Sequence, residues 1–266
     1  MTPQETSELQ PGRDGVIRCS AWLDAIVCGD CLNEMPKMPA QSVDAIISDL
    51  PYGTTACKWD SVIPFAPLWA EWKRLLKPNG AIVLTASQPF TSALVMSNAG
   101  DFKYAWTWDR MVAPTGHLNA KKMPLRRTED VLVFYGSQCT YNPQMGNGKP
   151  VSHIGGANRP RGVFGENKVI ECRDVTSRYP VNLLQFKKVQ TRHGRLHRTQ
   201  KPVELMRYLV RTYTNPGDVI LDPCCGSGTT CVAAMQEGRH YIGIEKETNY
   251  AEITKQRIYE ARGLGV

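Results

Sequence analysis

The segment 48–53 (SDLPYG) brings together groups suited to chemistry on a planar base. It follows an apolar run and places the Asp49 carboxylate, the Leu50 carbonyl and the Tyr52 ring on one loop. Pro51 fixes its own φ and biases Leu50 toward extended backbone, so the carbonyl is held in one direction. The two acceptors can bind an exocyclic amine while the ring stacks on the base that carries it. Taken alone, the same residues also make an ordinary turn.

A second loop, residues 222–230 (DPCCGSGTT), has the composition of a nucleoside-binding turn. It joins a strand pattern to a helix pattern, and Gly226 and Gly228 let the backbone approach a ligand closely. Nineteen residues after Gly226, another apolar run ends at Glu245, whose carboxylate can accept hydrogen bonds from ribose hydroxyls. Cys231 stands where a dinucleotide fingerprint has its third glycine, which disfavours a cofactor with a pyrophosphate.

Apolar periodicity around these loops predicts an α/β fold with a doubly wound, mostly parallel sheet. Ligands bind such sheets at the carboxyl ends of the strands, where both loops would lie. The expected strands are 25–27, 43–47, 81–85, 104–108, 131–135, 218–222 and 240–244. The expected helices are 65–76, 90–97, 202–212, 229–237 and 248–260.

The middle of the chain differs in composition and charge. Residues 136–198 are rich in Gly, Asn, Pro and Arg and lack sustained helical periodicity, which indicates a loop-rich insertion. Residues 111–200 carry 15 lysines and arginines against five acids, although the net charge of the whole chain is only +7. Such a concentrated positive field suits a polyanion, but a solvated basic surface has the same composition.

The overall composition is that of an ordinary soluble globular protein, with 42% hydrophobic and 21% charged residues among 266. No apolar run is long enough to span a membrane, and residues 1–15 form a polar tail rather than a secretory signal. The nine cysteines are scattered, and Cys28 and Cys31 make a lone C-x-x-C, which favours reduced thiols over a metal site. We therefore expect a cytoplasmic protein with no membrane partner and no metal.

In their order along the chain, the two motifs make this sequence resemble the amino-methylating DNA methyltransferases of the circularly permuted β class. In that family a tetrapeptide Asp/Ser/Asn-Pro-Pro-Tyr/Phe precedes the DNA-recognition region, and the glycine loop for S-adenosylmethionine comes last. Asp49, Pro51 and Tyr52 match the tetrapeptide, whereas Leu50 replaces its first proline. Only the backbone carbonyl acts at that position, so the replacement is expected to be tolerated.

The resemblance covers about residues 25–135 and 197–260 and implies a Rossmann-like methyltransferase fold. It divides the chain into three parts. These are a polar tail (1–15), a catalytic and cofactor-binding domain (16–135 and 199–266) and a target-recognition insertion (136–198).

The resemblance also implies a cofactor site. Asp30 matches the acid that contacts the adenine amine of the cofactor, and Lys201 and Pro202 match the segment over its methionine part. Cys224 stands where the family often has Phe, which alters the packing against the adenine. The expected cofactor-binding residues are Asp30, Lys201, Pro202, Asp222, Pro223, Cys224, Gly226, Ser227, Gly228, Thr229, Thr230 and Glu245.

The implied reaction is methyl transfer from S-adenosylmethionine to the N6 amine of adenine in double-stranded DNA, because Asp at the first tetrapeptide position usually accompanies adenine. Asp49, Leu50, Pro51 and Tyr52 would act on a flipped base by direct transfer. The expected DNA contacts are Arg126, Arg127, Arg159, Arg161, Lys187, Lys188, Arg192, Arg195 and Arg198. The family further implies a homodimer and a bacterial or phage-infected cell.

Three alternatives stay open. Methylation of the N4 amine of cytosine would use the same fold and cofactor site. A NAD-linked oxidoreductase is disfavoured by Cys231 and by the loop at 49–52. A DNA-binding protein without catalysis is disfavoured by the intact Asp49 and Tyr52.

Overall fold

The computed structural model describes residues 22–54, 57, 60–112, 114–155, 170–189 and 200–263. The polar tail expected at 1–15 lies outside the described residues. Within the described ranges, no helix has both the length and the apolar character needed to cross a bilayer. No group of three or more His, Cys, Asp or Glu side chains in those ranges could hold a metal ion.

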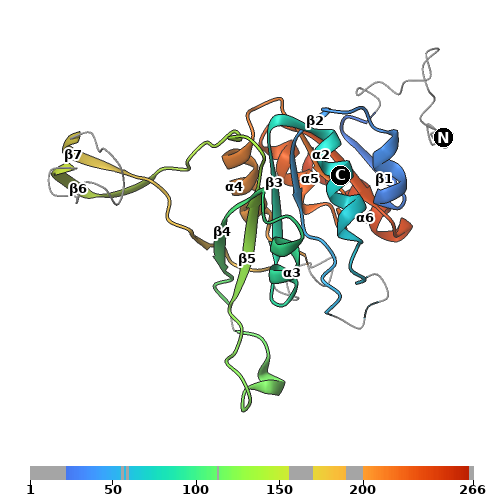
Figure 1. Cartoon of the computed structure of the whole chain (residues 1–266), viewed down its shortest axis with the longest axis horizontal. Helices are drawn as coiled ribbons and strands as arrows, with labels where there is room; N and C mark the ends of the chain where they lie inside the picture. The colour runs from blue at the N-terminus through green and yellow to red at the C-terminus, as the bar shows by residue number, and fades with distance from the viewer. Residues whose placement is uncertain are drawn as a thin grey trace. The chain divides into compact units, whose positions relative to one another are not determined.

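An eight-stranded sheet forms the centre of the main unit, which comprises residues Met1–Asn142 and Asn182–Val266 (Figure 1). The strand order is β1 (Ala25–Cys28), β10 (His240–Glu245), β9 (Val219–Asp222), β2 (Val43–Ser48), β3 (Leu76–Ala86), β5 (Thr128–Phe134), β4 (Phe102–Asp109) and β8 (Leu183–Gln185). In this order, the first five strands pair in parallel, β5 is antiparallel to both of its neighbours, and β8 is parallel to β4. The predicted mostly parallel α/β sheet is therefore confirmed.

Both faces of this sheet are buried because its central strands are apolar at consecutive positions. In β3, Ala81 and Val83 join one core cluster, whereas Ile82 and Leu84 join the other. Successive side chains of a strand point to opposite faces, so an unbroken apolar run requires a helical layer on each side.

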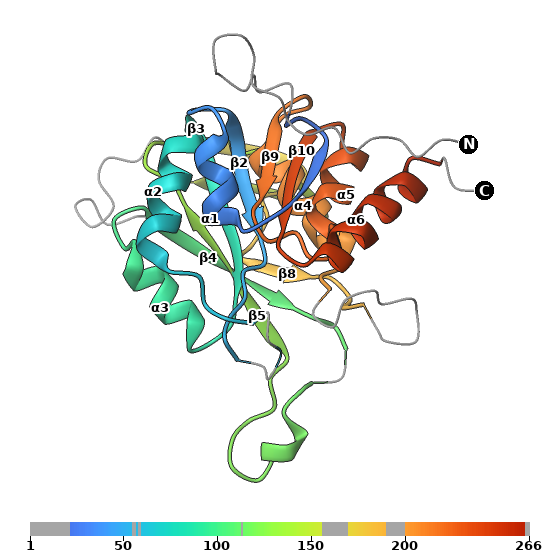
Figure 2. The same ribbon diagram turned by 90° about the vertical axis from the view of Figure 1, so that its right-hand side faces the viewer.

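Helices supply these two layers (Figure 2). One layer contains α1 (Cys31–Glu34), the 3-10 turn η2 (Met35–Lys37), α2 (Phe65–Leu75) and α3 (Phe90–Ser97), and the other contains α4 (Val203–Tyr213), α5 (Thr229–Gln236) and α6 (Thr248–Ala261). In α2, Leu68, Trp72 and Leu75 recur at intervals of four and three residues, so they share one face and are all buried. The expected helical segments agree with the observed ones within a few residues at each end.

The start of β3 differs from the sequence expectation. The residues Pro78-Asn79-Gly80, a turn signal between the expected helix 65–76 and the expected strand 81–85, lie inside the strand, which begins at Leu76. Leu76 pairs with Val43, and the Lys77 ammonium binds the Asp44 carboxylate at 2.8 Å. These contacts across the sheet hold the segment extended, and a local sequence pattern does not reveal them.

Residues Pro143–Val181 form a second compact unit. Its described part contains an antiparallel pair of strands, β6 (Gly146–Gly155) and β7 (Ile170–Arg178). The region 136–198, expected to be loop-rich, thus contains two strands that the sequence pattern did not predict, because glycine and polar residues obscure their alternation. It also contains β8, which pairs with β4 in the main sheet and buries Leu184. The role of 136–198 in target recognition stays a prediction.

The pairing of β2 with β9 brings the two sequence motifs together. These parallel strands are neighbours, with Ala45 opposite Ile220 and Ile46 opposite Leu221. Both strands therefore end at the same edge of the sheet. The Ser48 hydroxyl, at the end of β2, donates a hydrogen bond of 2.7 Å to the Asp222 carboxylate at the end of β9.

The loop after β9 needs glycine for two different reasons. Gly226 and Gly228 both adopt left-handed backbone, with φ of 54° and 74°. A side chain at Gly228 would also collide with Thr254 of α6, whose hydroxyl donates a hydrogen bond of 2.7 Å to the Gly226 carbonyl. Gly228 thus allows α6 to pack against the loop and fix its course.

Gly217 provides a matched comparison, because its φ is 84° but a Cβ there would meet no atom within 4 Å. We expect Gly217→Ala to lower the free energy of unfolding by about 1 kcal/mol through backbone strain alone. Gly228→Ala should lower it by about 2 kcal/mol or more, because the methyl group also displaces Thr254. Urea unfolding measures both values. Equal losses would show that the contact with Thr254 has no role.

Candidate active site

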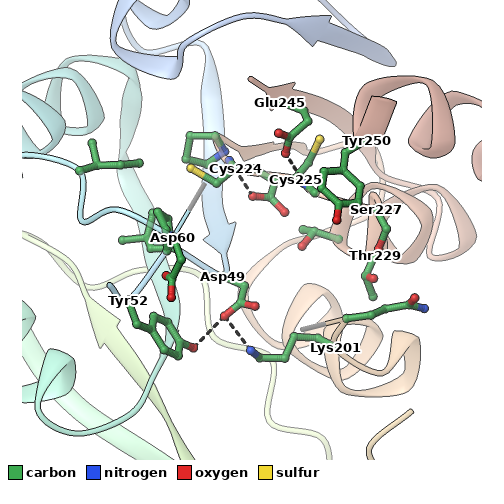
Figure 3. Close-up of a pocket in the computed structure, with 18 of the residues that line it drawn as sticks. Asp49, Tyr52, Asp60, Lys201, Cys224, Cys225, Ser227, Thr229, Glu245 and Tyr250 are labelled. Atoms are coloured by element: carbon green, nitrogen blue, oxygen red, sulfur yellow. Dashed lines mark hydrogen bonds and ion pairs between the residues drawn. The ribbon is translucent and has the colours of Figure 1, made fainter. Parts of the chain in front are cut away.

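The two loops line one cavity of about 490 Å³ at the carboxyl edge of the sheet (Figure 3). The sequence-based expectation that they meet there is confirmed. Asp49 and Tyr52 follow β2, Ser227 belongs to the glycine loop, and Glu245 ends β10. The volume is in the range of small-molecule sites.

Glu245 closes the glycine loop through its carboxylate. One oxygen accepts a hydrogen bond of 2.8 Å from the Gly226 amide, and the other accepts one of 2.8 Å from the Glu247 amide. Burial raises the pKa of Glu245 above its usual value. Each carboxylate oxygen has a second lone pair, so Glu245 can accept further hydrogen bonds from hydroxyl groups of a ligand.

Asp222 lies at the floor of the same cavity and is 3% exposed. It accepts hydrogen bonds from the Ser48 hydroxyl at 2.7 Å and from the Cys224 amide at 3.2 Å. Burial nevertheless dominates and raises the pKa of Asp222 to about 6. The Asp222 carboxylate thus connects the end of β2 to the glycine loop, although burial disfavours its charged form.

Asp30 and Cys224 occupy the wall of the cavity on the β1 side. Asp30 caps α1 by accepting a hydrogen bond of 3.0 Å from the Leu32 amide, and its carboxylate lies 3.1 Å from the Lys246 ammonium. A hydrogen bond with the Cys31 thiol, together with burial, raises the pKa of Cys224 well above its usual value. Cys224 is therefore a neutral, half-buried thiol.

Asp49 is the centre of a polar cluster. Its Oδ1 atom accepts hydrogen bonds from the Tyr52 hydroxyl at 2.7 Å, from the Thr85 hydroxyl and from the Lys201 ammonium at 2.7 Å. Within the described part of the chain, these hydrogen bonds to Asp49 all end on Oδ1. The Oδ2 atom is thus the oxygen left for an incoming donor.

The loop that carries Tyr52 is held rigid from both sides. Asp60, which is 8% exposed, accepts hydrogen bonds from the Gly53 and Thr54 amides at 2.8 and 3.0 Å. The Tyr52 ring stacks on Phe90, with centroids 5.1 Å apart and planes 23° from parallel. Burial and the nearby Asp49 charge raise the pKa of Tyr52 well above its usual value, so the phenol stays protonated.

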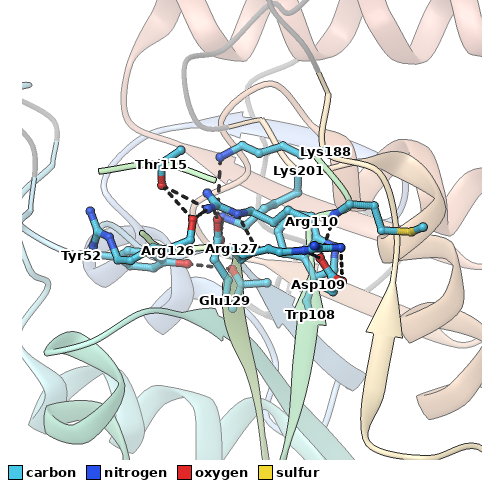
Figure 4. Close-up of polar contacts among 12 residues, drawn as sticks. Tyr52, Trp108, Asp109, Arg110, Thr115, Arg126, Arg127, Glu129, Lys188 and Lys201 are labelled. Carbon is cyan, nitrogen blue, oxygen red and sulfur yellow. Dashed lines mark hydrogen bonds and ion pairs between the residues drawn. The ribbon is translucent and has the colours of Figure 1, made fainter. Parts of the chain in front are cut away.

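Lys201 has two carboxylate partners in this site, Asp49 (Figure 3) and Glu129 (Figure 4). Its ammonium lies 2.7 Å from Asp49 and 3.3 Å from Glu129, and 5.5 Å from the centre of the Tyr52 ring. Burial would lower the pKa of Lys201, but the charges of Asp49 and Glu129 and the hydrogen bond to Asp49 outweigh it and raise the pKa well above its usual value. Lys201 is therefore a fixed positive charge beside Asp49.

Glu129, at the start of β5, holds a group of cations around the cavity (Figure 4). Its side chain is 11% exposed and lies 3.3 Å from Lys201, 3.6 Å from Arg110 and 3.7 Å from Lys188. Arg110 is itself only 4% exposed. One carboxylate thus balances several buried positive charges.

Sequence reasoning did not single out Thr85, Glu129, Asp60 or Arg110. Thr85 lies near the end of β3 and Glu129 near the start of β5, each next to an apolar run, so their place at strand ends was the available signal. Nothing in the local sequence indicates that Glu129 meets Lys201, 72 residues further along the chain. Of the expected cofactor-binding residues, Pro202 and Gly228 do not line the cavity, whereas the others do. Pro202 precedes the first turn of α4.

The expected DNA contacts fall into three groups. Arg126 and Lys188 line the cavity. Arg127 is exposed but binds Asp109 at 2.8 and 2.9 Å, and Lys187 is exposed. Arg159, Arg161, Arg192, Arg195 and Arg198 lie outside the described residues.

Comparison with known proteins agrees with this site. The family N6_N4_Mtase, described as DNA methylase, matches residues 43–256. DNA adenine methyltransferase YhdJ of Escherichia coli K12 is 29% identical over an alignment of 249 residues that covers 88% of this chain and 82% of YhdJ. Type II methyltransferase M.HinfI of Haemophilus influenzae is 27% identical over an alignment of 271 positions, gaps included, that covers 91% of this chain and 70% of M.HinfI.

Solved structures give the same result. M1.HpyAVI, solved in complex with S-adenosylmethionine, is 25% identical with a TM-score of 0.59, and the match covers 87% of this chain and 98% of that one. PvuII DNA methyltransferase, described as cytosine-N4-specific, shares the fold with a TM-score of 0.61 at 16% identity, over 90% of this chain and 91% of its own. The fold is that of a methyltransferase. This chain belongs to the N6/N4 family of DNA methylases, and the resemblance found in the sequence is confirmed.

The raised pKa of Asp222 predicts a pH-dependent effect on stability. Because its pKa is about 6 in the fold and lower in the unfolded chain, the folded form binds more protons, and stability falls as pH rises through that window. Asp222→Asn removes the buried charge but keeps an acceptor. We expect this variant to be more stable than the wild type by about 2 kcal/mol at pH 7.5, with the difference vanishing toward about pH 4. Denaturant unfolding at several pH values tests this, and a pH-independent difference would contradict it.

The charge balance at Glu129 predicts a large stability loss on neutralisation. Glu129→Gln leaves Arg110, Lys188 and Lys201 without their shared carboxylate, so the free energy of unfolding should fall by about 3 kcal/mol. Glu71→Gln is the control, because it breaks a 2.7 Å ion pair with Arg74 that is more exposed to solvent. That loss should stay below about 1 kcal/mol. Similar losses in the two variants would show that Glu129 does not hold the cluster.

Proposed function

We propose that this chain transfers a methyl group from S-adenosylmethionine to the N6 amine of adenine in double-stranded DNA. The observation that carries the proposal is the shared cavity, in which Asp49 faces the glycine loop and Glu245. Asp as the first residue of the tetrapeptide favours adenine over cytosine. The adenine-specific name of the relative YhdJ is consistent with this choice.

The donor set on the β10 side fits a nucleoside cofactor. Glu245 offers acceptors for ribose hydroxyls, Asp30 offers one for an adenine amine, and the left-handed backbone at Gly226 permits close approach. The cofactor would supply an electrophilic methyl group on a sulfonium. The fixed positive charge of Lys201 lies 2.7 Å from the Asp49 carboxylate and orients it.

Asp49 and Leu50 would then activate the target amine. The lone pair of an aromatic amine is conjugated with the ring, so the nitrogen is a weak nucleophile. Hydrogen bonds from its two N–H groups to the Asp49 Oδ2 atom and the Leu50 carbonyl favour a pyramidal nitrogen whose lone pair faces the methyl group. As the N–C bond forms, the S–C electron pair goes to sulfur and the nitrogen releases a proton toward Asp49. The Asp49 charge stabilises the positive charge that develops on the nitrogen.

The target base must leave the DNA stack to reach the cavity. Arg126 and Lys188 line the cavity and are the described residues that we propose for contacts with the flipped nucleotide. Region 136–198 is proposed to read the sequence around it. A homodimer is proposed as the assembled state.

The test is expression in a methylation-free host, followed by digestion of the host DNA to nucleosides and mass measurement. We expect N6-methyladenine, and sequencing of modified bases then gives the recognition site. Asp49→Asn should lower kcat by about 100-fold or more, because it removes the charge beside the reacting nitrogen. The control Asp101→Asn, which removes a surface carboxylate paired with Lys73, should keep full activity.

Other products would overturn the assignment in distinct ways. Detection of N4-methylcytosine in place of N6-methyladenine would show that the target base is cytosine, the family's other substrate. Unmodified DNA, together with retention of labelled S-adenosylmethionine by the purified chain, would indicate a DNA-binding protein without catalysis.

A further inference from the structure

An arm of 18 residues, 110–127, connects β4 to β5, and we call it the β4–β5 arm. Figures 1 and 2 both show it extending beyond the end of the sheet. It has ordered structure of its own. Thr115 and Arg126 exchange backbone hydrogen bonds of 2.8 and 2.9 Å across its base, and a 3-10 turn, η3 (His117–Asn119), lies toward its tip.

The base of the β4–β5 arm is fixed by Arg110. This buried guanidinium donates to the Arg126 carbonyl, to the Arg127 carbonyl at 3.0 Å and to the Thr115 hydroxyl at 3.1 Å. It therefore holds the two sides of the arm together where they leave the sheet. A rigid base allows the tip to be presented in a defined direction.

The tip of the arm is apolar and exposed. Leu118 is fully exposed, and Met123 retains 55% of its accessible surface. Both belong to one compact turn, since the Met123 amide donates a hydrogen bond of 3.0 Å to the Asn119 carbonyl. Single exposed apolar residues are common, but here they gather on an extended turn that nothing in the described main unit covers.

The charge around this apolar tip has one sign. Between residues 111 and 128 the sequence has four cations and no acid. Lys121 and Lys122 lie between Leu118 and Met123 and are exposed. A surface that combines apolar side chains with unbalanced positive charge complements a polyanion with an apolar interior, which describes the DNA duplex.

The arm also lies at the right place for the target base. β4 runs in the same direction as β3, because each is antiparallel to β5, and β3 is parallel to β2. The arm therefore starts at the same sheet edge as the loop at 48–53 that follows β2. Arg110, Thr115 and Arg126 from its base line the cavity. A duplex whose flipped base occupied the cavity would present its neighbouring base pairs to the arm.

We propose that Leu118 and Met123 insert into the DNA base stack beside the target, while Lys121 and Lys122 contact phosphates. This inference rests on the proposed function. Extruding a base leaves a gap in the stack, and apolar side chains that enter the gap recover part of the lost contact. The arm thus acts on the base-flipping step, separately from the sequence reading proposed for 136–198.

The experiment compares two DNA duplexes that carry the recognition site found by modified-base sequencing. One is fully paired, and the other has a mismatch opposite the target base, which is then already partly unstacked. The double variant Leu118→Ser/Met123→Ser should lose about ten-fold or more in kcat/KM on the paired duplex and about two-fold or less on the mismatched one. The control Met96→Ser removes a 76% exposed apolar side chain from the last turn of α3 and should match the wild type on both.

A second pair of variants separates insertion from charge. Lys121→Gln/Lys122→Gln should weaken binding to both duplexes equally and reduce the slope of log K against log salt by about two. Fluorescence of 2-aminopurine at the target position reports flipping without turnover, and the serine variant should lower the flipped signal.

Several results would overturn the inference. An equal loss of the serine variant on both duplexes, or no loss on either, would exclude insertion into the stack. A change in sedimentation of this variant without DNA would instead assign the tip to a contact between two copies of the chain. If the wild type methylates neither duplex, the proposed function fails, whereas an active wild type with an unaffected serine variant rejects the insertion alone.

Discussion

The parallel pairing of β2 with β9 is the contact on which the site depends. It joins segments 174 residues apart in sequence, and the hydrogen bond from Ser48 to Asp222 ties their ends. Because parallel strands end at the same edge, this one pairing puts the loop at 48–53 next to the glycine loop at 222–230. The order of the two motifs along the chain then has little effect on the geometry of the cavity, which explains how a permuted chain builds a methyltransferase site.

The buried cations of the cavity, Lys201 and Arg110, each have a carboxylate partner. Lys201 lies between Asp49 and Glu129, and Glu129 in turn balances Arg110 and Lys188. Asp222 has no ion pair within the described residues, and burial raises its pKa to about 6.

Much of the fold was predictable because its strands are unbroken apolar runs and its helices have regular apolar spacing. That the loops at 48–53 and 222–230 lie at one site was predictable, because their residue types and spacing are unusual and each follows a strand. Glu129 and Arg110 could not be found in this way, since their importance arises from contacts made only when β4, β5 and the segment before α4 come together. The strands β6, β7 and β8 were missed because their sequences have too little alternation between apolar and polar residues. The start of β3 was misplaced because pairing across the sheet overrides the local turn signal at Pro78–Gly80.

Arg110 has a consequence for how distant parts of the enzyme communicate. The same guanidinium binds the backbone of residues 126 and 127 and lies beside Glu129, which contacts the lysine that neutralises Asp49. Residues 126 and 127 are therefore connected to the Asp49 carboxylate through a short series of ionic and hydrogen-bonded contacts. The proposed binding of nucleic acid by the arm and the proposed chemistry at Asp49 thus share one continuous set of polar side chains.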